Sequence, residues 1–183
     1  MINGKKIGMI GACDINGLIG YDGQLAFKNS TDLKRFKELT MGSTLIMGSK
    51  TFASLPKSGL PGRKIIVLHN NFEKPRYEGE VMHHNNIVES IKSAITEKIW
   101  IAGGAQIYKE ALILHIPDFI DLTILNGIVM SPIKDNLKTQ REKSVNMPEI
   151  SYMWRVVSEV QNEEDPKLFH RRYEIREPWG WKD

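Results

Sequence analysis

Cysteine and long apolar runs are both scarce in this sequence of 183 residues. The single cysteine, Cys13, cannot form a disulfide within the chain, and one thiol is too few for a cysteine-based metal cluster. No uninterrupted apolar run approaches the roughly 18 residues that a transmembrane helix needs. The apolar stretch at 7–13 is short, contains two glycines and ends at Asp14, so it predicts a buried first strand and not a cleaved leader. We therefore expect a soluble, cytoplasmic protein.

Charge of one sign is not concentrated anywhere in the chain. The 25 lysines and arginines exceed the 22 acidic residues by only three, and they are spread along the sequence. A nucleic-acid-binding protein normally has a basic stripe, so we expect no nucleic-acid partner. The histidines have no metal-ligand spacing, which argues against a metal site. The apolar content of 41% and charged content of 26% are typical of a globular protein, and the length fits one domain over 1–183.

Short apolar runs alternate with helical patterns, which predicts an α/β sheet with helices packed on its faces. Strands are expected at 7–13, 43–47, 64–68, 80–83, 99–102 and 120–129, and helices at 31–41, 50–55, 87–95 and 105–112. Strand-like runs at 154–159 and 168–175, joined by an acidic loop, predict an antiparallel hairpin at the edge of the sheet. The polar segment at 130–151 is interpreted as a long surface excursion.

The helix expected at 31–41 carries a candidate for proton chemistry. Helical geometry puts Asp32 and Phe36 one turn apart on the same side, with Leu33 beside them. A carboxylate against an apolar wall is partly desolvated, which raises its pKa and suits proton handling. The alternative is that Asp32 only caps the helix or stabilises its dipole, and taken alone this motif favours the alternative.

Two junctions between a strand and a helix could bind phosphate. Gly103 and Gly104 follow a buried strand and open a helix, which exposes backbone N–H groups to an anion. A tight turn without a ligand explains this pair equally well, because the full dinucleotide motif of three glycines is missing. The junction Gly48-Ser49-Lys50-Thr51 offers a lysine and two hydroxyls, with a plain helix cap as its alternative.

An arginine follows the turn formed by Leu60, Pro61 and Gly62. Arg63 stands at the entrance of the strand expected at 64–68, where its guanidinium could hold a carboxylate through two hydrogen bonds. The alternative is a solvated surface arginine.

Taken in order, these motifs resemble those of the dihydrofolate reductase family. The resemblance covers roughly residues 5–129, and the final hairpin agrees with it in outline. The matching segments are Ile10-Gly11-Ala12, Asn16-Gly17-Leu18-Ile19-Gly20, Asp32-Leu33, Phe36-Lys37, Ile46-Met47-Gly48, Lys50-Thr51-Phe52, Leu60-Pro61-Gly62-Arg63, Ile101-Ala102-Gly103-Gly104, Ile107-Tyr108 and Leu122-Thr123.

This resemblance implies a single α/β domain around a mostly parallel, eight-stranded sheet with flanking helices and an antiparallel C-terminal hairpin. It also implies NADPH-dependent reduction of 7,8-dihydrofolate to 5,6,7,8-tetrahydrofolate, by hydride transfer to C6 with Asp32-assisted protonation at N5. The expected partners are therefore NADPH as cofactor and dihydrofolate as a small-molecule substrate. We expect a monomer, with a dimer as the alternative.

The resemblance implies a role for each matching residue. Asp32 is the ionisable residue of the pterin pocket, Thr123 orients it, and Phe27 forms an aromatic wall in the mobile loop at 17–28; these three are the predicted catalytic residues. Arg63 is implied to hold the carboxylate of the glutamate tail, and the Gly103-Gly104 peptide is implied to be cis. The predicted substrate-binding residues are Ile10, Ala12, Asp32, Leu33, Phe36, Leu55, Leu60, Arg63, Ala102, Tyr108 and Thr123. The predicted cofactor-binding residues are Ala12, Ile19, Gly20, Gly48, Ser49, Lys50, Thr51, Leu68, His69, Asn70, Ala102, Gly103, Gly104, Ala105, Gln106 and Ile107.

The chain departs from the family pattern at several positions. Leu25-Ala26-Phe27 replaces Leu-Pro-Trp and lacks the indole N–H, Ser49 replaces an often basic residue, and Ala102 is smaller than the usual Ile or Val. Two other functions therefore stay open: a reductase of the same fold for another pterin or a pyrimidine, and a folate- and NADPH-binding protein without turnover. The presence of both Asp32 and Arg63 argues against the first of these, and intact Asp32, Thr123 and Gly103-Gly104 argue against the second. An aromatic C-terminal tail, at 178–181, is expected to pack on the domain or on a second copy.

Overall fold

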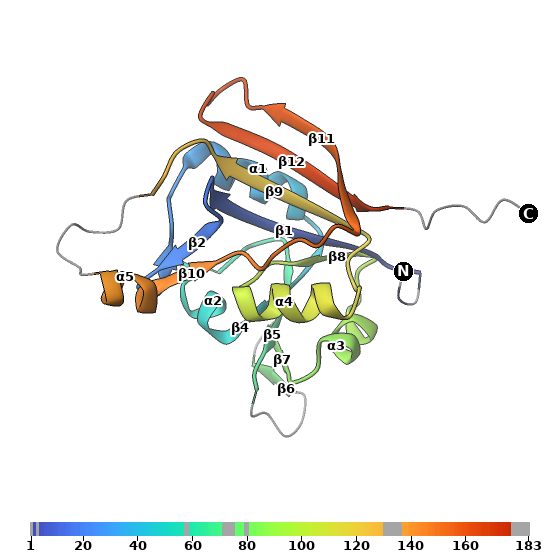
Figure 1. Cartoon of the computed structure of the whole chain (residues 1–183). Helices are drawn as coiled ribbons and strands as arrows, with labels where there is room; N and C mark the ends of the chain where they lie inside the picture. The colour runs from blue at the N-terminus through green and yellow to red at the C-terminus, as the bar shows by residue number, and fades with distance from the viewer. Residues whose placement is uncertain are drawn as a thin grey trace, which may run out of the picture.

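The computed structural model describes residues 2, 4–56, 59–70, 76–78, 81–129 and 137–176. Its main feature is a nine-stranded sheet in the order β11-β12-β9-β1-β8-β4-β5-β7-β6 (Figure 1). Six central strands run parallel: β1 (Lys6–Asp14), β4 (Thr44–Gly48), β5 (Lys64–Leu68), β7 (Val81–His84), β8 (Lys98–Ile101) and β9 (Phe119–Leu125). Antiparallel strands complete both edges: β6 (Arg76–Glu78) at one, and β11 (Trp154–Gln161) with β12 (Leu168–Ile175) at the other.

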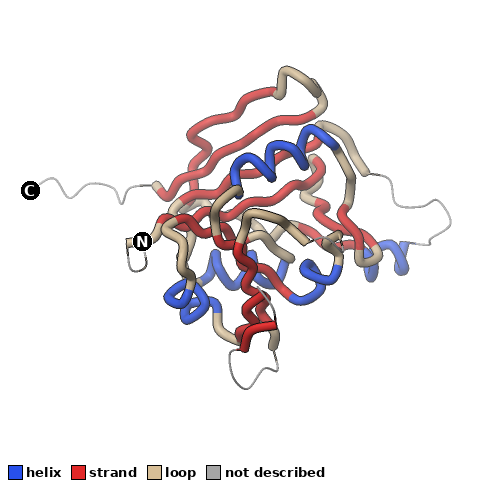
Figure 2. The backbone as a smooth tube through the Cα atoms, turned by 180° about the vertical axis from the view of Figure 1, so that it is seen from behind, coloured by secondary structure: helices blue, strands red, loops and turns tan. Residues whose placement is uncertain are grey.

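Helices cover both faces of this sheet. The helix α1 (Ser30–Thr40) lies on one face, as Figure 2 shows from behind, whereas α3 (Ile87–Ser93) and α4 (Ala105–Ile113) lie on the other (Figure 1). The short helix α2 (Ser49–Ala53) follows β4 directly. No helix in the described part of the chain is long and apolar enough to cross a membrane.

A second sheet stands beside the main one. It has three short strands, in the order β10-β2-β3: β2 (Leu18–Tyr21), β3 (Gln24–Leu25) and β10 (Ser144–Asn146). The helix α5 (Leu137–Lys143) leads directly into β10. The segment at 137–146, interpreted from its polarity as a surface excursion, therefore contains a helix and a paired strand.

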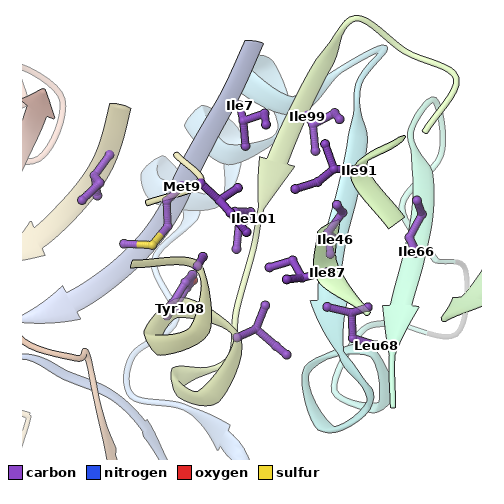
Figure 3. Close-up of a cluster of buried hydrophobic side chains, with 14 of the residues drawn as sticks. Ile7, Met9, Ile46, Ile66, Leu68, Ile87, Ile91, Ile99, Ile101 and Tyr108 are labelled. Carbon is purple, nitrogen blue, oxygen red and sulfur yellow. The ribbon is translucent and has the colours of Figure 1, made fainter. Parts of the chain in front are cut away.

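The central strands are buried on both faces, as their continuous apolar runs predict. In β4, Leu45, Ile46 and Met47 are each at most 1% exposed, although successive side chains point to opposite faces. The core beneath α3 and α4 contains Ile7, Met9, Ile46, Ile99 and Ile101 (Figure 3). The core beneath α1 contains Ile10, Leu45, Met47, Ile65, Val67, Trp100 and Phe119.

The predicted α/β class, the mostly parallel sheet and the antiparallel C-terminal hairpin are confirmed. The strand β6 adds a ninth member to the eight strands expected, and β2, β3, β10 and α5 were not predicted, because such short elements have little periodicity. The strand expected at 120–129 is wrong at its end. The chain leaves β9 at Leu125, because Gly127 N–H donates to the Leu125 carbonyl (2.9 Å) and Val129 N–H donates to the buried Asp14 carboxylate (3.0 Å). The aromatic tail at 178–181 lies outside the described residues.

One glycine lets the core beneath α1 close. Gly8 of β1 lies opposite Trp100 of β8 and Phe119 of β9, and the two rings meet edge to face with centroids 5.3 Å apart. A Cβ atom at Gly8 would lie 2.5 Å from the Trp100 ring and 2.7 Å from the Phe119 ring. Only a residue without a side chain fits between these two aromatic rings.

We therefore expect Gly8→Ala to destabilise the protein by roughly 1–3 kcal/mol, the usual cost of overpacking a core. The measurement is the thermal unfolding midpoint. Gly127→Ala is the matched control, because a Cβ there meets nothing within 4 Å. Equal midpoints for the two variants would contradict the close packing at Gly8.

Candidate active site

A cavity of about 750 Å³ opens at the edge of the sheet where parallel strands end. In sheets of this kind the carboxyl ends of the strands are the usual place for a ligand. The cavity brings together all sixteen predicted cofactor-binding residues. They are Ala12, Ile19, Gly20, Gly48, Ser49, Lys50, Thr51, Leu68, His69, Asn70, Ala102, Gly103, Gly104, Ala105, Gln106 and Ile107, and the lining also includes Tyr21, Gly23, Gln24, Leu25, Ser54, Tyr108 and Val145.

The glycine pair after β8 forms the middle of the cavity. The peptide between Gly103 and Gly104 is cis, as expected. Gly103 has a φ of +105°, a backbone conformation that residues other than glycine rarely adopt. Gly48 N–H donates to the Gly103 carbonyl (2.8 Å), so the junction after β4 is tied to the junction after β8. Among the described residues no side chain caps α4 at Gly104, which leaves its first N–H groups available to an anion.

One end of the cavity is polar and contains a cation. Lys50 and Ser49 come from the start of α2, and His69 and Asn70 follow β5. The Nε2 atom of His69 lies 2.7 Å from Nδ1 of the buried His83. This contact holds the His69 ring at the rim of the cavity.

The three-stranded sheet covers the opposite end. Residues of β2 and β3 line the cavity together with Val145 of β10, and Met147 N–H donates to the Gly17 carbonyl (2.8 Å). A further link joins Lys143 Nζ to the Asp22 carboxylate (3.5 Å). Sequence reasoning missed Val145, because nothing in a polar segment of that composition indicates a strand that pairs with residues 18–21.

A largely buried carboxylate lies beside this cavity on α1. Burial raises the pKa of Asp32, whereas a hydrogen bond from the Thr123 side chain and the charge of Arg35 lower it. Thr123 is buried on β9, directly opposite Ala12 of β1, and Ala12 lines the cavity. The carboxylate is therefore one strand away from the cavity wall.

The capping role considered for Asp32 belongs to a different residue. The Asn29 side chain accepts hydrogen bonds from Thr31 N–H (2.9 Å) and Asp32 N–H (3.1 Å), so it caps α1. The side chain of Asp32 instead bonds to Thr123 across the site. A carboxylate in the first turn that leaves the cap to its neighbour is available for chemistry.

Apolar side chains extend from Asp32 along α1. Five predicted substrate-binding residues pack against the core beneath α1 or belong to it: Ile10, Phe36, Leu55, Leu60 and Ala102. Ala102 also lines the cavity, so these apolar side chains reach the cavity there. Arg63 lies near the C-terminal end of α1, where its guanidinium is 3.4 Å from Thr40 Oγ1. The rise along the helix from Asp32 to Thr40 is about 12 Å. Burial lowers the pKa of Arg63, although a guanidinium stays charged at neutral pH.

Three other predicted site residues, Tyr108, Leu33 and Phe27, do not belong to the apolar group beneath α1. Tyr108 is buried, and its hydroxyl donates to the Ile10 carbonyl (2.7 Å), so it holds β1 against α4 as well as lining the cavity. Leu33 is 49% exposed, so most of that side chain faces solvent. Phe27 is partly buried in the connection between β3 and α1 and does not belong to the cavity lining.

Neither metal nor thiol chemistry has support at this site. The described residues contain no group of three or more metal-ligating side chains. The Cys13 thiol is buried, and burial raises its pKa to about 11, so it is a poor nucleophile at neutral pH. Asp32 is the side chain here whose raised pKa suits proton exchange.

Comparisons with known proteins agree with this geometry. The profile of the dihydrofolate reductase family matches residues 6–176. A dihydrofolate reductase from Mycobacterium leprae is 40% identical over 109 residues, 58% of this chain and 65% of that relative, so the match spans just under two thirds of the relative's length. Dihydrofolate reductase type 9 from Escherichia coli is 30% identical over 162 residues, 85% of this chain and 84% of the relative. The structure of dihydrofolate reductase from Enterococcus faecalis with NADP(H) and RAB-propyl has a TM-score of 0.75 and 27% identity, covering 94% of this chain and 97% of that one. The chain belongs to the dihydrofolate reductase family.

Proposed function

We propose that this protein is an NADPH-dependent dihydrofolate reductase. The observation that carries the proposal is the partly buried Asp32 carboxylate on α1, next to apolar side chains that reach a cavity built from two strand-to-helix junctions. We take the space along these apolar side chains as the substrate slot. The slot suits a flat, largely apolar heterocycle, and Arg63 at its far end suits a carboxylate. A folate has these features in this order, with the pterin at one end and glutamate at the other.

The cavity fits a phosphorylated dinucleotide. The open N–H groups of α4 and the glycine pair would receive the pyrophosphate, because a Cβ at Gly104 would lie only 3.2 Å from Thr51 Oγ1 and would narrow the passage. Lys50, Ser49, His69 and Asn70 would surround the phosphate on the adenosine ribose. The backbone of Ala12 and Ile19 would hold the nicotinamide end. The Enterococcus faecalis relative contains NADP(H), which supports this assignment.

The reaction transfers one hydride and one proton. A cofactor held by the cavity-lining residues would supply the hydride for C6 of the pterin, and N5 would take up a proton. The chain positions the two rings: Ala102 and Ala12 keep the wall between slot and cavity thin, so the rings can stack. Asp32 would bind the pterin 2-amino group and N3 and favour protonation at N5, with the proton arriving through water.

Thr123 and burial give Asp32 its proposed role. Burial raises the pKa of Asp32 above its ordinary value, which makes the carboxylate a better proton acceptor than a free one. The Thr123 side chain bonds to the carboxylate and fixes its direction. Phe27 stands where the family usually has a tryptophan, so position 27 offers no indole N–H to a water near N5.

The first test is the loss of NADPH absorbance when dihydrofolate is added to the purified protein. We expect turnover that needs both compounds. NADPH binding without turnover, detected by fluorescence, would instead favour another substrate or a binding protein. Failure to bind NADPH would contradict the assignment of the cavity.

We expect Asp32→Asn to remove most of the turnover while NADPH affinity stays nearly unchanged. The same variant should unfold at a higher temperature at neutral pH. A carboxyl group whose pKa is raised in the folded state lowers the stability of the protein as pH rises through that pKa, and asparagine does not ionise. Each kcal/mol gained corresponds to about 2–4 °C in a chain of this size. The gain should disappear near the ordinary Asp value of 3.8, where the wild-type carboxyl is protonated as well. Unchanged turnover would remove Asp32 from the mechanism.

Lys50→Ala should weaken NADPH binding by roughly tenfold, the loss of one charge-assisted hydrogen bond. NADH affinity should stay nearly constant, because NADH lacks the extra phosphate. Titration of both cofactors measures the difference. Lys64→Ala is the control, since Lys64 is an exposed lysine at the opposite end of β5 and is not part of the cavity lining. An equal loss for NADPH and NADH would refute the assignment of Lys50.

A further inference from the structure

A buried ion cluster lies behind Asp32, between α1 and the strands β9 and β12. Its centre is Asp121, which is 2% exposed. One oxygen of its carboxylate pairs with the guanidinium of Arg35 on α1, and the other lies 2.7 Å from Arg172 Nη2 on β12. Arg172 stands directly opposite Asp121 in the register of the two strands. Two guanidiniums and one carboxylate leave the cluster with a net charge of 2 − 1 = +1.

The cluster and the Asp32 site share two elements. Arg35 follows Asp32 by three residues, so both side chains lie on the same side of α1. Asp121 and Thr123 are two residues apart on β9 and point to the same face of the sheet. Thr123 bonds to Asp32, and Arg35 donates to Asp121, so two residues on one face of β9 hold two residues on one side of α1.

Pairing with Asp121 keeps the Arg35 guanidinium inside the protein. An arginine on a helix normally extends into solvent, where its field is screened. The side chain of Arg35 is instead only 22% exposed. A charge that is fixed and partly desolvated acts more strongly on a neighbouring group than the same charge in water does.

We propose that Arg35 is a positioning residue for the catalytic site, oriented by Asp121, and that it holds Asp32 in its carboxylate form. Burial alone would favour the neutral acid, and a neutral acid would bind the pterin amino group less strongly. The value of this arrangement for turnover rests on the proposed function. The effect of Arg35 on the charge of Asp32 does not.

Several polar and titratable groups lie around Asp32 and the ion cluster in the described part of the chain. On β9 these are Thr123 and Asp121, and on α4 the buried Tyr108, whose raised pKa keeps it neutral. On β12 they are Arg172 and His170. His170 Nδ1 lies 3.4 Å from Thr123 Oγ1, and its Nε2 lies 2.9 Å from Asn162 Nδ2.

The imidazole of His170 offers a second probe of the same charge. Burial and the charge of Arg35 lower the pKa of His170, and Asp121 raises it. Arg35 therefore acts in the same direction on two groups: it favours the charged form of Asp32 and the neutral form of His170. Loss of the charge at position 35 should move both titrations to higher pH.

The test is NMR titration of the Asp32 carboxyl carbon and the His170 ring protons in Arg35→Gln. The glutamine amide can still donate to Asp121, so the ion cluster loses charge and keeps a hydrogen bond. We expect both midpoints to move to higher pH, and the protonated fraction of Asp32 to rise several-fold at a fixed pH above its wild-type midpoint. Arg35→Lys, which restores the charge, should return both midpoints toward the wild-type values.

Arg172→Gln is the matched control, because it removes the other cation bound to Asp121 but on a strand that is one position farther from Asp32. In Arg172→Gln, the titration midpoint of Asp32 should stay close to its wild-type value. Equal shifts in the two glutamine variants, or a shift in neither, would overturn the proposal and leave the cluster a purely structural feature. If Arg35→Gln does not fold, Arg35→Met, which keeps the aliphatic stem, takes its place. The readout is the ionisation of Asp32, so the result stands even if the reductase assay fails.

Discussion

The parallel register of β1, β8, β4 and β5 brings the carboxyl ends of four strands to one edge of the sheet. The strands themselves are buried on both faces, so most of the polar residues that can meet a ligand come where each strand ends. The cavity lining follows this rule: Ala12 lies near the end of β1, Lys50 follows β4, His69 follows β5 and Gly103 follows β8. The hydrogen bond from Gly48 to Gly103 then fixes two of these ends relative to each other. The cavity is thus a consequence of strand register, and packing between strands sets its shape.

Burial of the Asp32 carboxylate suits the proposed proton chemistry, but it lowers the stability of the fold when the group is charged. Asp32 lies in surroundings that favour its neutral form, and Thr123 and Arg35 oppose that tendency. Asn29 takes over the helix cap, which frees Asp32 for the site. Arg35 has a partner of its own in Asp121, so the charge that acts on Asp32 is itself partly buried and paired. A substitution of Arg35 or Asp121 should therefore alter the protonation of Asp32 before it alters the packing around it.

The three-stranded sheet over the cavity depends on contacts between segments that are far apart in the sequence. The strand β10 pairs with β2, and Val145 reaches the cavity from a stretch far along the chain. Asp14 adds a second connection, because its carboxylate accepts hydrogen bonds from Leu18 N–H (2.8 Å) and Val129 N–H (3.0 Å). The segment that contains β2 is therefore held from two sides.

The amino-acid sequence by itself determined the α/β class, the long central strands and the glycine junctions, because apolar periodicity and turn chemistry are local properties of the chain. The sixteen residues that the family resemblance predicts to bind the cofactor line one cavity in the folded chain, and their role in binding stays a prediction. The short strands β2, β3 and β10 escaped prediction because two to four residues carry too little pattern. Only the tertiary structure decided that Asn29 caps α1, that Arg35 meets Asp121, and that β10 covers the cavity. Each of these depends on which side chains the folded sheet brings together, and no local pattern in the sequence records that.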